Sequence, residues 1–329
     1  MKISQISPGA AVNEHPFPFD PSYGMDLDAL LQVSAPDNAP SDFAEFWSRR
    51  YNEARDTTVE PKLGRKVRSA RGVEFYEIEF TSVGGVRLGG WLALPADGEV
   101  ERGFVFGHGY SGRDAPDSVL PVARAAAIFP ASRGLPTKGL IPGVPADPGG
   151  HVLHGVESPA TYIVGGCVAD LWCAATALTE LVPAAGRRLD YSGISFGGGT
   201  GALALPWDDR FTAAQLIVPT FGNHPLRVTL ECNGSGAAVR ERFLTDPAVL
   251  DVLAYFDAAT AARHLRLPVH AVPALFDPSV PPPSQFAIVN SLAGPVEALV
   301  ATAGHFHEFP QYTQETVRLV RATREFFAA

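Results

Sequence analysis

The residues best suited to chemistry form the run Gly193-Ile194-Ser195-Phe196-Gly197, which fits the G-x-S-x-G pattern of a nucleophile elbow. An apolar stretch at 189–194 precedes the serine and predicts a strand, and the small residues at 198–205 predict a helix. A strand-to-helix turn this tight strains the serine backbone, and only glycine fits two positions before and after it. The turn presents the hydroxyl at the edge of the sheet, above a helix N-terminus that favours an oxyanion. Ser195 is therefore predicted to be a nucleophile.

Two other interpretations of this run are open. A glycine-rich turn can simply allow close packing, without any chemistry. A phosphate or dinucleotide loop would require Gly-Lys-Ser/Thr or the G-x-G-x-x-G register, and the sequence has neither at this place. The strand and helix on either side favour the nucleophile.

The partners of such a serine follow it in the order acid, then histidine, along the chain. Asp277 comes directly after an apolar stretch at 271–275, and the prolines that follow it would fix its loop. Asp251 and Asp257 fit less well because their segment is predicted to be helical. Histidines that precede Asp277 would break the order if they were the base, among them His151, His154, His224, His264 and His270.

Two histidines follow the last predicted strand, at 296–301, and either could be the general base. His307, which begins His-Glu-Phe, is preferred, and His305, which follows a glycine suited to a tight turn, is the alternative. The base takes the serine proton, and the aspartate orients the imidazole. The oxyanion needs two backbone N–H donors, for which Phe196 and Tyr110 are the candidates.

The elements that must position these residues are predicted along the whole chain. A helix begins near Ser41, which could cap it, and segments 73–80 and 86–94 form a β-hairpin. Apolar runs that alternate with helices indicate an α/β fold with a mostly parallel sheet and helices on both faces. We expect one α/β-hydrolase domain over 1–329, with an N-terminal arm and helix at 1–70 and a catalytic core at 71–329. The other predicted strands are 103–107, 125–129, 189–194, 214–218 and 269–275, and the other helices are 168–181 and 310–327.

Composition limits the classes of partner. The 329 residues carry a formal charge of −9, and no strongly basic cluster is present, so neither nucleic acid nor an anionic membrane surface is expected as a partner. No 18-residue apolar stretch free of charge predicts a membrane span, and no secretory signal is evident, so a cytoplasmic location is expected. The three cysteines lack disulfide or zinc spacing and are predicted to be buried thiols. No metal is expected.

Several motifs together resemble the acetyl xylan esterase/cephalosporin C deacetylase family, known as carbohydrate esterase family seven. The resemblance covers nearly the whole chain, and its most specific blocks are Tyr255-Phe256-Asp257 and Ala293-Gly294-Pro295. The other blocks are Phe19-Asp20, Asp42 to Trp47, Gly89 to Pro95, Gly109 to Gly112, Arg133-Gly134, Gly155 to Tyr162 with Asp170, Phe276-Asp277 with Pro281-Pro282, and His307-Glu308.

The resemblance implies a cofactor-free α/β-hydrolase that deacetylates small acetylated sugars and related esters. It implies Ser195, Asp277 and His307 as the catalytic residues, with the Tyr110 and Phe196 amides as the oxyanion hole. It also implies a homo-oligomer, with a hexamer as the family's form.

The chain departs from the family pattern at three places. Phe196 replaces a glutamine, Leu135 replaces the glutamine of Arg-Gly-Gln, and Ile163 to Gly166 replace a stretch rich in tyrosine and arginine. The apolar Phe196 and Leu135 favour an alternative function, a broader carboxylesterase or thioesterase. A non-catalytic binding protein is a third hypothesis, against which the complete Ser, Asp and His set argues.

Overall fold

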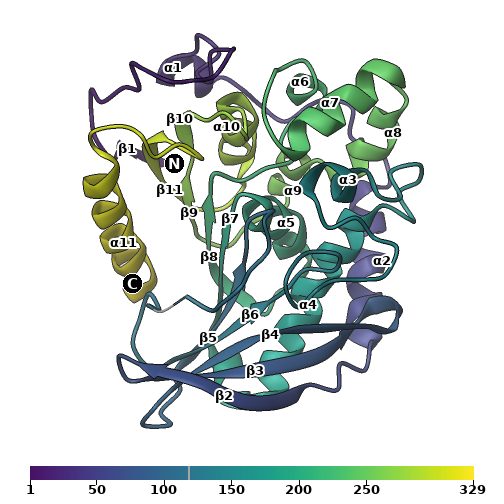
Figure 1. Ribbon diagram of the computed structural model, residues 1–329, viewed down its shortest axis with the longest axis vertical. Helices are drawn as coiled ribbons and strands as arrows, with labels where there is room; N and C mark the ends of the chain where they lie inside the picture. Colours follow the sequence, from purple (N-terminus) through teal and green to yellow (C-terminus); the bar gives the residue numbers. More distant parts are fainter. Residues whose placement is uncertain (118) are drawn as a thin grey trace.

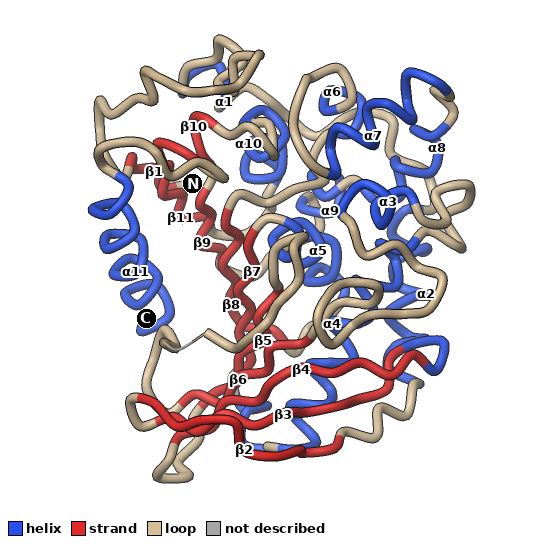
Figure 2. The backbone as a smooth tube through the Cα atoms, in the orientation of Figure 1, coloured by secondary structure: helices blue, strands red, loops and turns tan. Residues whose placement is uncertain are grey.

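The computed structural model describes residues 1–117 and 119–329, and a mixed β-sheet runs through the middle of this part (Figures 1 and 2). Ten strands follow one another across the sheet in the order β1-β11-β9-β8-β7-β5-β6-β4-β3-β2, and β10 pairs with β11 outside this path. The strands that precede the predicted site residues lie in the parallel part of the sheet, so their carboxyl ends meet at one edge.

The parallel part consists of short, almost wholly apolar strands. Most are buried on both faces, which explains why their sequences show apolar runs rather than alternation. The predicted strand at 269–275 is divided in two at Pro273, because proline has no N–H to donate to a neighbouring strand. The strands of this part are β1 (Lys2–Gln5), β5 (Arg102–Gly107), β7 (Leu189–Ile194), β8 (Phe211–Ile217), β9 (Val269–Val272), β10 (Ala274–Phe276) and β11 (Val296–Ala303).

The antiparallel part contains the predicted hairpin, β3 (Val73–Ser82) and β4 (Val86–Pro95), together with β6 (Ala125–Pro130) and β2 (Lys62–Ala70). The sequence analysis did not predict β2, an edge strand whose residues are nearly all exposed. It therefore lacks the alternation of apolar and polar residues by which a half-buried strand is recognised. Strand β1, at the other edge, lies within the segment predicted to be an extended arm.

Helices cover both faces of the sheet, as the α/β prediction required (Figure 1). The helices α2, α4, α5, α9 and α10 pack on one face, and α11 lies on the other. The helix bounds are α1 (Leu27–Leu30), α2 (Phe43–Asp56), α3 (Pro148–Leu153), α4 (Ile163–Leu181), α5 (Phe196–Ala204), α6 (His224–Arg227), α7 (Ser235–Thr245), α8 (Val249–Leu253), α9 (Ala258–Ala262), α10 (Pro282–Ser291) and α11 (Tyr312–Ala328).

The starts of helices α2 and α4 differ from the prediction. Helix α2 begins after Asp42 rather than Ser41, and the Asp42 side chain does not cap it but accepts a hydrogen bond from the Tyr255 hydroxyl at 2.7 Å. Helix α4 begins at Ile163, five residues before the predicted start, and so includes Gly165 and Gly166. A Cβ on Gly165 would lie 2.6 Å from the Arg50 guanidinium, so the helix accepts the conformational cost of glycine at this position.

Helix α4 is long and apolar enough to cross a membrane by length and composition alone. Most of its side chains, however, are buried inside the protein, where Trp172 contacts Trp47 of α2 with a ring separation of 6.2 Å. Such burial is usual for the central helix of a layered fold. The three cysteines, of which Cys167 and Cys173 lie on this helix, are buried free thiols, as predicted.

Candidate active site

Ser195 stands between the end of β7 and the start of α5, with φ 54° and ψ −111°, a conformation that non-glycine residues rarely adopt. The turn is closed by contacts that only glycine allows. A Cβ on Gly193 would lie 2.5 Å from the Gly197 carbonyl oxygen, and one on Gly197 would lie 2.5 Å from the Gly107 backbone. The G-x-S-x-G spacing therefore has the steric cause that the sequence analysis assigned to it.

His305 is the imidazole that meets this serine. Its Nε2 lies 2.9 Å from Ser195 Oγ, and its Nδ1 lies 2.8 Å from Asp277 Oδ2. Because an ionised carboxylate can only accept, Nδ1 carries the hydrogen and Nε2 is free to accept the serine proton. The three side chains thus form a continuous serine, histidine and aspartate chain.

His307, the histidine preferred from sequence, does not take this place. Strand β11 ends at Ala303, and the chain turns at once, with His305 at φ 44°, so that the ring of His305 returns towards the sheet edge. His307 comes two residues later, is exposed, and its ring packs against Tyr312 with a centroid separation of 4.6 Å. The geometry therefore replaces His307 with the alternative, His305.

Asp277 is fully buried immediately after β10, and its carboxylate accepts four hydrogen bonds. Oδ1 accepts from the backbone N–H groups of Ser279 and Val280 at 2.8 and 2.9 Å. Oδ2 accepts from His305 and from Gln285 Nε2, which lies 2.9 Å away. Gln285 was not predicted from the sequence, since a glutamine inside an apolar helix gives no local signal of this role.

The two predicted oxyanion donors lie beside each other. The rings of Tyr110 and Phe196 pack with a centroid separation of 4.5 Å, and both residues flank Ser195 at the carboxyl ends of β5 and β7. In the described part of the chain, neither backbone N–H donates to another protein group. Two free donors next to a serine hydroxyl are the arrangement that binds the oxyanion of an acyl-transfer intermediate.

The pKa of His305 reflects opposing influences. Burial lowers it, but the negative charge of Asp277 and the hydrogen bond to it raise the pKa above the usual histidine value. Arg227 acts in the opposite direction to Asp277 and lowers it. Arg227 is buried, with 3% of its surface exposed, and donates to the Thr220 hydroxyl. The sequence analysis missed both residues because neither belongs to a recognisable motif.

A cavity of about 400 Å³ opens at Ser195 and His305. Phe196 and Leu135 do not line it: Phe196 packs inward against Tyr110 and Phe221, and Leu135 has no exposed surface. The side chains that could hydrogen-bond a ligand there are Ser111, Thr220, Asn233, Ser235 and Ser279.

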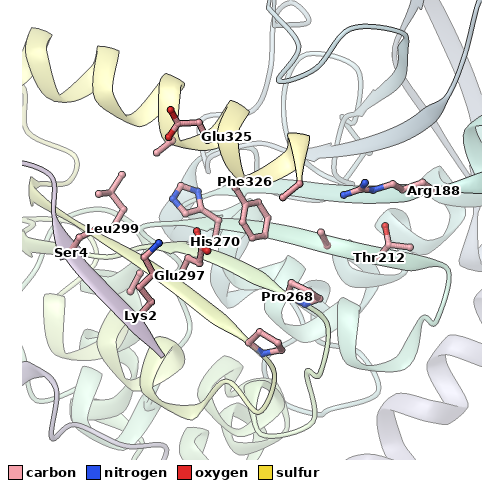
Figure 3. Close-up of a pocket in the computed structure, with 15 residues that line it drawn as sticks. Lys2, Ser4, Arg188, Thr212, Pro268, His270, Glu297, Leu299, Glu325 and Phe326 are labelled. Atoms are coloured by element: carbon pink, nitrogen blue, oxygen red, sulfur yellow. The ribbon is translucent and has the colours of Figure 1, made fainter.

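A larger cavity, of about 670 Å³, lies between α11 and the sheet, at the amino ends of β7, β9 and β11 (Figure 3). Its central groups satisfy one another: the His270 ring packs on Phe326 at 5.4 Å, and Gln215 Nε2 donates to His270 Nδ1 at 2.9 Å. The strands separate this cavity from Ser195, which stands at their carboxyl ends. The cavity at Ser195 is therefore distinguished by the residues that line it and not by its size.

Gly304 offers a test of the histidine's position. A Cβ at Gly304 would collide with Asp277 Oδ2 and come within 2.8 Å of Val218, so Gly304→Ala should displace the carboxylate from His305. We expect the kcat of ester hydrolysis to fall about 10²-fold. Gly186→Ala is the matched control, because its Cβ would make only ordinary contacts with Thr179. A Gly304→Ala enzyme with the kcat of the Gly186→Ala enzyme would contradict the arrangement.

The pH profile offers a second test. A base must be neutral to accept a proton, so kcat/KM should fall as pH drops through the raised pKa of His305. Arg227→Gln removes a charge that lowers this pKa, so the acidic limb should move to higher pH, whereas Arg227→Lys keeps the charge and should leave the limb in place. An unmoved limb in a folded Arg227→Gln enzyme would show that Arg227 does not act on His305.

The layered fold and the hydrogen-bonded serine, histidine and aspartate chain define an α/β-hydrolase. The sequence pattern of the family described as acetyl xylan esterase (AXE1) matches residues 21–322. The chain belongs to this family of carboxylic ester hydrolases.

Solved structures agree on the fold. The acetyl xylan esterase from Paenibacillus sp. R4 is 22% identical with a TM-score of 0.75, over 91% of this chain and 99% of that one. Acetyl xylan esterase 1 from Thermoanaerobacterium sp. JW/SL YS485 is 20% identical with a TM-score of 0.78, over 93% and 99%. The acylaminoacyl peptidase of Pyrococcus horikoshii matches less fully, with 17% identity and a TM-score of 0.60, over 83% and 42%.

Proposed function

We propose that the protein is a serine esterase that removes acetyl groups from small, oxygen-rich alcohols such as acetylated sugars. The observation that carries this proposal is the hydrogen-bonded chain of Ser195, His305 and Asp277 at a small cavity whose wall includes hydroxyl and amide side chains. The hydroxyl and amide side chains of that wall suit an alcohol rich in oxygen atoms. Membership of the acetyl xylan esterase family supports the same substrate class.

The proposed reaction has two half-reactions. Ser195 Oγ attacks the acetyl carbonyl carbon while its proton moves to His305 Nε2, and the resulting oxyanion accepts from the Tyr110 and Phe196 N–H groups. His305 then gives the proton to the leaving alcohol, which departs as the C–O bond breaks and leaves an acetyl ester on Ser195. A water molecule attacks this ester, His305 takes its proton and returns it to Ser195, and acetate leaves. Asp277 stays ionised throughout and stabilises the imidazolium.

The alternative, a broader carboxylesterase or thioesterase, rested on the apolar residues Phe196 and Leu135. Because both residues point away from the cavity, they do not widen it or make it apolar. Ile194 is the one apolar wall residue with a large exposed fraction, 45%, and it would be the contact for a longer acyl chain. The third hypothesis, a binding protein without activity, does not account for the complete catalytic chain.

The acyl preference tests the proposal. We expect kcat/KM for p-nitrophenyl acetate to exceed that for the butyrate by about tenfold or more, and the hexanoate to be slower still, because a cavity of about 400 Å³ must also hold the alcohol. The Ser195→Ala variant measures the background. Faster turnover of butyrate or hexanoate than of acetate would favour the broader esterase instead.

The cellular location, the absence of a cofactor and the oligomeric state of the protein are also proposals. We propose a cofactor-free cytoplasmic enzyme that forms a homo-oligomer, with the family's hexamer as the expected form. Light scattering on the purified protein measures the mass of the assembly, and a monomer of 329 residues would contradict the oligomer.

A further inference from the structure

Arg133 and Gly134 matched a family motif in the sequence but take no part in the proposed reaction. The Arg133 guanidinium pairs with Asp170 of α4, with Nη2 to Oδ1 at 2.6 Å, and the Arg133 backbone N–H donates to Asp170 Oδ2 at 2.9 Å. Ser82 Oγ donates to the same carboxylate at 2.6 Å. Asp170 thus holds both the side chain and the backbone of Arg133, three residues after the end of β6.

The fixed Arg133 backbone holds the ring of His151. His151 is completely buried on α3, and its Nε2 lies 2.9 Å from the Arg133 carbonyl oxygen. Since a carbonyl can only accept, Nε2 carries the hydrogen and Nδ1 is an acceptor. The Tyr110 hydroxyl lies 3.0 Å from Nδ1 and therefore donates to it.

Gly134 makes room for this ring. It adopts φ 79°, and a Cβ there would lie 2.7 Å from His151 Cδ2. The motif therefore has two parts with one result: arginine fixes the carbonyl that holds the imidazole, and glycine leaves the space that the imidazole fills.

The other end of this chain of contacts is the turn from Gly109 to Gly112, which carries Tyr110 and is called the oxyanion turn. Tyr110 packs on Phe196 at 4.5 Å, and His151 stands edge-on to both rings, 5.5 Å from Tyr110 and 6.3 Å from Phe196. A second buried imidazole, His108, is anchored to the same segment after β6, because its Nε2 accepts from the Ser132 N–H at 3.0 Å. The two residues that carry the oxyanion donors are thus held by rings anchored to the segment after β6.

We propose that His151 is a positioning residue of the esterase: in its neutral form it accepts from the Tyr110 hydroxyl and so holds the Tyr110 backbone N–H where the oxyanion forms. The inference rests on the proposed function, which makes that N–H a catalytic donor. His151 itself does not line the cavity at Ser195.

The buried surroundings keep both partners in the required protonation state. Burial lowers the pKa of His151, which keeps Nδ1 available as an acceptor, and burial raises the pKa of Tyr110, which keeps its hydroxyl protonated. Besides the Tyr110 hydroxyl and the Arg133 backbone carbonyl, which contact the ring, the charged or titratable groups that act on the pKa of His151 are His154, Asp170 and Asp147.

Three variants separate the two hydrogen bonds of the imidazole. His151→Asn can place its amide oxygen near the position of Nδ1 and keep an acceptor for Tyr110, whereas His151→Gln can reach the Arg133 carbonyl but offers Tyr110 no acceptor in place. Tyr110→Phe removes the donor and keeps both the ring and the backbone N–H. We expect kcat for p-nitrophenyl acetate to fall about tenfold or more in His151→Gln and in Tyr110→Phe, with KM nearly unchanged, and to recover largely in His151→Asn.

Two further measurements distinguish positioning from a general loss of structure. A trifluoromethyl ketone that mimics the acetyl group forms an oxyanion on the serine, so its inhibition constant should rise by the factor by which kcat/KM falls in each variant. The double variant Tyr110→Phe/His151→Gln should lose no more kcat than either single variant. Equal kcat in all variants, or the same loss in His151→Asn as in His151→Gln, would overturn the positioning role. If the unmodified protein neither hydrolyses the ester nor is inhibited by the ketone, the proposed function itself fails.

Discussion

Replacing His305 with alanine should lower kcat/KM for a small acetate ester on the order of 10⁴-fold or more. The reason is that His305 Nε2 lies 2.9 Å from Ser195 Oγ. Without this imidazole, the serine must attack with its proton in place, and the leaving alcohol receives none.

His307→Ala is the matched control, two residues away on the same loop. Its exposed ring contacts Tyr312, so we expect rates within about twofold of the unmodified enzyme. Steady-state assays of both variants, after circular dichroism has confirmed that each is folded, decide between the histidines. A large loss in His307→Ala with an active His305→Ala would restore the preference drawn from the sequence.

Ser195→Ala should have an effect of the same size or larger, because no other serine or threonine hydroxyl of the described cavity is hydrogen-bonded to an imidazole. The change removes one oxygen atom, and a smaller side chain fits the strained turn, so stability should change little. Ser235→Ala, which removes a hydroxyl from the wall of the same cavity, is the control and should keep most of its kcat. Activity in Ser195→Ala above the uncatalysed rate would identify a different nucleophile.

The sequence was most informative where local geometry allows few solutions. The glycines around Ser195 have no substitute in so tight a turn, and the buried parallel strands cannot carry polar residues, so both were predictable. The edge strands β1 and β2 were missed because exposed strands tolerate almost any residue.

The choice between His305 and His307 could not be made from the sequence. Both histidines follow the same strand, and which ring returns to the serine depends on the backbone of a single turn, where His305 takes φ 44°. A signal was present in Gly304, since a glycine beside a catalytic carboxylate indicates a close approach. Gln285 and His151 left no such signal, because their roles arise only when distant segments meet.

The role of Phe196 in the structure also differs from the role expected from the sequence. As a sequence feature, an apolar residue next to the nucleophile indicated an apolar pocket. In the structure its backbone faces the site, and its ring packs among Tyr110, His151 and Phe221, where it contributes to the support of the oxyanion turn. The residue type therefore bears on the stability of the turn and not on the choice of ester.

The central claim is that Ser195 is a nucleophile activated by His305. It is tested most directly by treating the protein with a fluorophosphonate and measuring its intact mass, followed by peptide mapping. The account predicts one adduct per chain, located on Ser195, absent from Ser195→Ala and formed far more slowly in His305→Ala. No adduct on the unmodified protein, or an adduct on another residue, would contradict it.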